Sequence, residues 1–362
     1  MASDYEQYLD YEQHLSPELK ELYFEHSRYK ALRVLIKKQC KDKSDGLIFA
    51  VRKDEIHIYY RGGRLLKITC TAKGKALKIY TDPKYAGDSK DPNNEILKLN
   101  KEESASVWCE KLEELKGYVA RYYAEHKNKE RLLQHRLELH NRDFNDEVVV
   151  IDNEYGVRKY AALLTHLDRT QENFCEFTDN ELKILSERGL DKDKVLSMSD
   201  DDIKRLKLEY KLCKVDLVVL FKGDDGKYKI CLTELKKENG ATVGKAGIKD
   251  HIQDFKIFTG SRKEDIVKSV ERLIAYKTRK EIDTIANYPA CGIELDKENI
   301  YISILCYDLS SDQKRKNVEK DIKQAFAEEA EKSLPNFYYN LDLSEEKDGY
   351  VLKKENLLKC HI

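Results

Sequence analysis

The strongest constraint on the fold is a pair of apolar segments joined by a short turn. Residues 215–221 (VDLVVLF) and 228–236 (YKICLTELK) are rich in the branched and aromatic side chains that favour strands, and Gly223–Gly226 lies between them. Two such segments around a short turn predict adjacent antiparallel strands. The rest of the chain must therefore build a sheet around this hairpin.

The segments that flank the hairpin predict a mixed α/β domain over residues 143–335. The expected strands and helices are, in chain order, strand 147–153, short helices within 179–207, the hairpin, helices 243–258 and 263–280, strand 299–307 and helix 311–333. Because a helical crossover returns the chain parallel to the strand it left, we expect a mixed central sheet that is not doubly wound. Residues 336–362 are expected to add a hairpin around Asp348-Gly349 or another extension.

The N-terminal region, residues 1–142, predicts a separate α+β domain. Ser16-Pro17 supplies a cap and a first-turn proline for a helix over 16–39. The expected meander and its closing helix comprise strands 47–51, 56–61, 64–70 and 76–80, with a Gly62-Gly63 hairpin turn, and a long helix over 101–141. Period-two alternation around a glycine pair is typical of antiparallel hairpins.

Composition narrows the class of protein. Lys and Arg (66) nearly balance Asp and Glu (67), so nucleic-acid binding would need a local concentration of basic residues. Nine cysteines are scattered without a CxxC pair, which argues against a disulfide scaffold or a structural zinc site. The acidic start does not resemble a signal peptide and no long apolar run is present, so we expect a cytoplasmic protein without membrane contact.

Three charged residues gather where the hairpin strands begin and end. Asp216 opens the first strand, and Glu234 and Lys236 close the second on one face, since residues two apart share a side. The start of one strand lies beside the end of its partner, so the two carboxylates should be neighbours. Paired carboxylates repel each other unless a cation lies between them, and hard oxygen ligands suit Mg²⁺ or Mn²⁺. Lys236 could orient a metal-bound water or stabilise a developing oxyanion.

An Asp on one strand and Glu-x-Lys on the next resembles the PD-(D/E)XK nuclease superfamily, whose fold is restriction-endonuclease-like. The resemblance covers about 144–307 and implies Asp216 and Glu234 as metal ligands, with the Leu235 carbonyl assisting. Val215 stands where the motif name has proline. The resemblance implies a Mg²⁺-dependent bacterial nuclease that hydrolyses phosphodiester bonds, DNA before RNA, in defence or DNA processing.

The resemblance also implies further residues around the site. Many members carry an additional acid upstream, for which Glu154 is the expected residue and Asp152 the alternative. The helix after the hairpin would bring Lys245, Lys249 and His251 towards the substrate. Its other interpretation is a solvated helix with an apolar stripe.

Two alternatives stay open. The same triplet recurs on expected helices, as in Glu18 to Lys20, so the motif alone carries little information, and the hairpin could simply have solvated charged ends. The fold could also serve as a non-catalytic module that binds nucleic acid or protein. A homodimer is compatible with either function.

Overall fold

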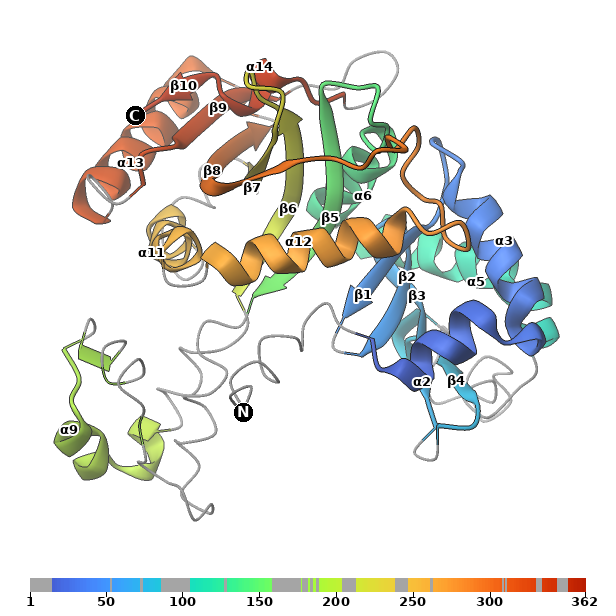
Figure 1. Ribbon diagram of the computed structural model, residues 1–362. Helices are drawn as coiled ribbons and strands as arrows, with labels where there is room; N and C mark the ends of the chain where they lie inside the picture. The colour runs from blue at the N-terminus through green and yellow to red at the C-terminus, as the bar shows by residue number, and fades with distance from the viewer. Residues whose placement is uncertain are drawn as a thin grey trace. The chain divides into compact units, whose positions relative to one another are not determined.

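The computed structural model is a mixed α/β protein with one antiparallel and one mixed sheet (Figure 1). The chain divides into two compact units, one of residues 13–155 and 215–362, the other of 1–12 and 156–214. The described residues are 15–52, 54–71, 74–85, 105–126, 129–157, 177, 182, 185–186, 189–203, 213–237, 247–260, 263–307, 309, 311–329, 334–343 and 351–362. In the smaller unit, Asp191 caps helix α9 (Lys192–Ser197) by accepting from the backbone N–H of Lys194.

The larger unit contains a six-stranded sheet in the order β10-β9-β8-β7-β6-β5. Its strands are β5 (Val148–Val157), β6 (Cys213–Lys222), β7 (Tyr228–Lys237), β8 (Leu295–Tyr307), β9 (Phe337–Leu343) and β10 (Cys360–His361). Strands β6 and β7 are antiparallel, whereas β8 runs parallel to both β7 and β9. The expected mixed sheet is confirmed.

Helices cover both faces of this sheet (Figure 1). They are α6 (Lys129–His140), α11 (Ile248–Thr259), α12 (Lys263–Lys277), α13 (Asp312–Glu329) and the short α14 (Lys354–Leu357). Leu133 and Leu137 of α6 pack with Leu217 and Leu235 on one face. Helices α11 and α12 contact β8, and α11 packs against α13. The charged residues of the hairpin lie at the ends of strands whose middle residues are apolar and buried.

A four-stranded antiparallel sheet forms the N-terminal part of the same unit. Its strands are β1 (Ile48–Arg52), β2 (Glu55–Tyr60), β3 (Gly63–Cys70) and β4 (Leu77–Tyr80), and a 3₁₀ turn, η3 (Pro83–Tyr85), follows. Helix α5 (Ala105–His126) packs on β3 and contributes Trp108 to the core. Tyr276 of α12 also enters this core, so the two sheets share packing.

The β2–β3 turn is one residue earlier than the sequence predicted. Tyr60 pairs with Gly63, so the turn consists of Arg61 and Gly62, with φ values of 48° and 82°. Positive φ at both positions fits the hairpin turn of type I′. Gly63 is needed for packing instead, because a Cβ there would lie 2.5 Å from the Tyr123 ring.

Two of the helices expected in the N-terminal region are each described as more than one element. The pattern over 16–39 contains α2 (Pro17–Lys20), a π-helical turn η1 (Glu21–Glu25), a 3₁₀ turn η2 (Ser27–Tyr29) and α3 (Lys30–Cys40). Ser16 caps the first of these as expected, accepting from the backbone N–H of Leu19. The pattern over 101–141 consists of two helices, α5 and α6. The hairpin expected around Asp348-Gly349 lies outside the described residues.

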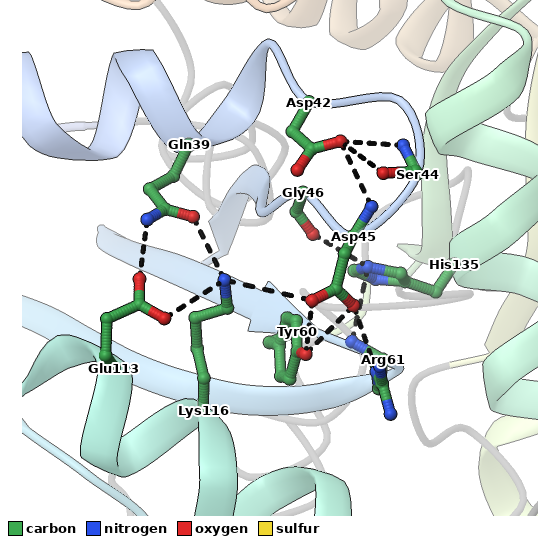
Figure 2. A network of polar contacts seen from close by, with 10 residues as sticks. All are labelled: Gln39, Asp42, Ser44, Asp45, Gly46, Tyr60, Arg61, Glu113, Lys116 and His135. Atoms are coloured by element: carbon green, nitrogen blue, oxygen red, sulfur yellow. Dashed lines mark hydrogen bonds and ion pairs between the residues drawn. The ribbon is translucent and has the colours of Figure 1, made fainter.

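Helix α6 lies between the two sheets. Leu139 packs against Ile48 and Tyr59 of the N-terminal sheet, opposite the leucines that face the larger sheet. Figure 2 shows the neighbouring His135 beside the backbone of Gly46 and Arg61. The boundary expected after residue 142 falls inside this compact unit. Strands β9 and β10, which lie in the expected C-terminal extension, belong to the large sheet. Separate folding of 1–142, 143–335 and 336–362 stays a prediction.

A buried ion pair joins the sheets directly. The guanidinium of Arg52 in β1 makes two hydrogen bonds, of 2.7 and 2.9 Å, to the carboxylate of Asp152 in β5. Asp152 is fully buried and Arg52 is 8% exposed. This bidentate geometry is the strong form of an Arg–carboxylate contact. Within the described part of the chain, no helix has the length and apolar character that a membrane span requires.

We predict that Arg52→Met lowers the free energy of unfolding by about 3–5 kcal/mol, because Asp152 keeps a buried charge without its partner. Urea denaturation measures this loss, and Arg52→Met with Asp152→Leu should recover much of it. The matched control is Lys323→Met, which removes an exposed pair with Glu319 on α13 and should cost no more than about 0.5 kcal/mol. An equally small loss for Arg52→Met would show that the pair does not join the sheets.

Candidate active site

Asp216 and Glu234 lie opposite each other at the ends of β6 and β7. The register that pairs Leu217 with Thr233 places the two acids in the next position. Residues directly opposite in an antiparallel pair extend to the same face. The hairpin therefore brings the two carboxylates together, as the sequence predicted.

Each oxygen of the Asp216 carboxylate accepts one hydrogen bond. Gln134 of α6 donates its Nε2 to Oδ1 at 2.7 Å, and the backbone N–H of Leu235 donates to Oδ2 at 2.7 Å. Burial raises the pKa of Asp216 well above its usual range, and the charges of Glu234 and then Glu130 raise it further. The carboxylate is oriented, but its surroundings oppose ionisation.

Glu234 has one partnered oxygen and one without a partner. Lys236 donates to Oε1 at 2.7 Å, while Oε2 is buried and accepts no hydrogen bond from any described residue. Burial raises the pKa of Glu234, and the ammonium of Lys236 partly offsets this effect. A buried carboxylate oxygen without a donor is costly, and a bound cation or water would relieve it.

His251 lies against both charged groups. Its Nε2 is 3.0 Å from Glu234 Oε1 and 3.0 Å from Lys236 Nζ. The residue stands in the first turn of α11, four positions after Gly247, the residue that precedes the helix. Lys236, which is 7% exposed, is thus held between a carboxylate and an imidazole at the end of the strand.

A second buried carboxylate pair provides an internal comparison. Glu138 and Asp152 are close enough for the charge of Asp152 to raise the pKa of Glu138, but each has its own cation. Lys277 is 2.6 Å from Glu138, and Arg52 holds Asp152. Each acid of that group thus has a cation, and Arg142 adds a further positive charge near Glu138. At the hairpin, Glu234 has Lys236 and His251 close by, whereas Asp216 is met by the neutral amide of Gln134 and has Glu130 nearby, so acids outnumber permanent cations there.

The structure adds two residues that sequence reasoning missed. Glu130 and Gln134 lie four residues apart on α6, so they share one side of the helix and both act on Asp216. Their i,i+4 spacing was visible in the sequence. Nothing in the sequence, however, showed that α6 packs against the hairpin.

The remaining expected residues have different outcomes. Glu154 lies in β5, and its side chain is outside the described residues, while Asp152 is occupied by Arg52. Lys245 also lies outside the described residues. Lys249 is exposed and forms a 3.1 Å ion pair with Glu328 of α13. Among the residues expected to contact substrate, His251 is placed beside Glu234 and Lys236.

Comparison of the chain with family models, with curated proteins and with solved structures finds no significant match to any of them. Within the described ranges, no three His, Cys, Asp or Glu side chains gather as a metal-binding cluster. The ligand set expected here is smaller, with two carboxylates and one backbone carbonyl. The function is therefore inferred from the geometry and charge of this site.

The charge imbalance predicts opposite effects for two matched substitutions. Glu234→Gln should raise the melting temperature by about 2–4 °C near pH 8, because it removes repulsion and its amide could donate to Asp216. Glu138→Gln should lower it by about 6 °C or more, because buried Lys277 loses its charge partner. Differential scanning calorimetry of both variants measures the two shifts.

The gain from Glu234→Gln should depend on pH. A raised pKa means that the folded state holds protons which the unfolded state releases, so the wild type loses stability as pH rises from about 4 towards the folded pKa values. The advantage of the variant should therefore grow from pH 5 to pH 8. A loss of stability like that of Glu138→Gln would show that Glu234 is mainly the structural partner of Lys236.

Proposed function

We propose that this chain is a Mg²⁺-dependent nuclease that hydrolyses phosphodiester bonds of nucleic acid, with DNA favoured over RNA. One observation carries the proposal: Asp216 and Glu234 are held side by side at a sheet end, with the ammonium of Lys236 2.7 Å from Glu234. A cation site with an adjacent lysine is the arrangement that phosphodiester hydrolysis needs. The sites and partners named below follow from it.

The order of elements supports a restriction-endonuclease-like fold. The hairpin β6–β7 carries the Asp and the Glu-x-Lys, helices α11 and α12 follow, and β8 returns parallel to β7. This is the sequence of elements that the PD-(D/E)XK resemblance implies. Glu130 stands on α6, the helix before β5, and is therefore a better match than Glu154 to the upstream acid that many members carry on their first helix.

The donors at this site fit a small divalent cation. Asp216, Glu234 and the Leu235 carbonyl would hold it. The N–H and C=O of one strand residue point to the same side. Because the Leu235 N–H donates a hydrogen bond to Asp216, the Leu235 carbonyl points to the same side as Asp216. The unpartnered Oε2 of Glu234 and the excess negative charge favour binding, and oxygen donors suit Mg²⁺ or Mn²⁺. When bound, the ion would acidify a water and stabilise charge on the phosphate.

The protein's own groups would divide the remaining work. Lys236 presents an ammonium at the edge of the carboxylate pair, where it can orient a water or stabilise the oxyanion. His251 keeps that ammonium in place through its Nε2. Burial of Glu234 and Lys236, at 4% and 7% exposure, lowers the local dielectric and strengthens these charge interactions. A nucleic acid is the proposed partner, and a homodimer would present two such sites.

Metal binding tests the first part of the proposal. We expect the wild type to bind Mn²⁺ in isothermal titration calorimetry and Asp216→Asn to lose most of that binding, because one ligand charge is gone. Asp224→Asn, in the turn of the same hairpin, is the matched control, and it should bind Mn²⁺ like the wild type. Equal binding by Asp216→Asn and wild type would remove Asp216 from the site.

Cleavage tests the second part. Lys236→Ala should cut a DNA or RNA substrate roughly 10²-fold more slowly with Mg²⁺ present, the typical loss for a group that stabilises developing charge. Its Mn²⁺ affinity should not fall, since both carboxylates remain and a competing cation is gone. Lys222→Ala, an exposed lysine of β6, serves as the control. If the wild type binds Mn²⁺ but cuts neither DNA nor RNA, a non-catalytic binding module becomes the better description.

A further inference from the structure

Gln134 is placed where it can control the geometry of the site from outside it. Gln134 is 4% exposed, and its amide donates to Asp216 Oδ1 at 2.7 Å, while the backbone N–H of Leu235 donates to Oδ2. With one donor on each oxygen, the carboxylate plane is fixed. Asp216 is thus oriented before any ligand binds.

We propose that Gln134 is a positioning residue that orients Asp216 to receive a divalent cation. This inference rests on the proposed function of the site. The chemical type of the donor matters, because an amide is neutral. Arg52 contacts the carboxylate of Asp152 in a bidentate manner and compensates its charge. Gln134 instead favours the ionised form of Asp216 by hydrogen bonding and leaves its negative charge for the metal.

The backbone that carries Gln134 is held on several sides. Leu133 and Leu137 pack on the large sheet, and Lys277 pairs with Glu138. The adjacent His135 lies with its Nε2 3.1 Å from Gly46 O and 3.2 Å from Arg61 N, as Figure 2 shows. Burial lowers the pKa of His135 to about 3, so its ring is neutral at ordinary pH. These contacts leave the amide little freedom to leave Asp216.

The test compares two variants of the same helix in the full-length chain. Gln134→Met keeps the length and helix propensity of the side chain and removes only the donor. Leu137→Ala loosens the packing of α6 without touching Asp216, and its stability should fall more. Isothermal titration with Mn²⁺, at a temperature where melting curves show all proteins folded, should give 10- to 100-fold weaker binding for Gln134→Met. Leu137→Ala should bind like the wild type.

The pH profile gives a second measurement. Without the amide donor, Asp216 ionises less readily, so half-maximal Mn²⁺ binding should need a pH about one unit higher in Gln134→Met. Leu137→Ala should keep the profile of the wild type. Unchanged Mn²⁺ affinity and profile in Gln134→Met, or equal weakening in Leu137→Ala, would overturn the positioning role and leave the metal site intact. A wild type that binds no Mn²⁺ would overturn both this inference and the proposed metal site.

Discussion

The rest of the larger unit depends on the burial of helix α6 between two sheets. Between Leu133 and Leu139 every residue except Arg136 is buried, which is unusual for a helix with so many polar side chains. Its leucines are shared between the two cores. Its polar side chains contact Asp216 in β6, Lys277 in α12 and the backbone of Gly46 and Arg61. Because a buried polar group without a partner is costly, each of these contacts restricts the helix to one position. Through the hydrogen bond from the Gln134 amide to Asp216, the position of α6 determines the orientation of that carboxylate.

Two carboxylate pairs within this unit show how the same chemistry can serve stability or function. Glu138 and Asp152 are balanced by Lys277 and Arg52, so they hold elements together. Asp216 is held by the neutral amide of Gln134 and has Glu234 and Glu130 nearby, so folding has to overcome repulsion among these acids. Unfavourable electrostatics that packing maintains are typical of functional sites. This difference, more than the motif itself, distinguishes the hairpin from an ordinary charged one.

The local sequence was enough to predict the hairpin, the parallel return of β8 and the proximity of Asp216 to Glu234. These features depend on strand periodicity, a short turn and the order of the elements. The local sequence did not predict the contact of Gln134 with Asp216, because these residues are 82 positions apart in the chain. The expected helix over 101–141 also hid the separate role of α6, since helical periodicity continues through both parts. Gly63 was assigned to a turn because glycine pairs favour turns, whereas its small size serves packing against Tyr123. The local sequence pattern determines where helices and strands form, whereas long-range packing determines which side chains they bring together.

The position of α6 has a consequence for how this protein can be divided. A truncated chain that began at residue 143 would keep both carboxylates and the lysine, and by motif it would look complete. It would also expose the face of the large sheet that Leu133 and Leu137 cover, and Asp152 would lose its ion-pair partner Arg52. A piece that keeps α6 and Arg52 together with the site therefore extends back through the N-terminal sheet. Transfer of the motif-bearing half to another protein would transfer the ligands without the helix that holds them.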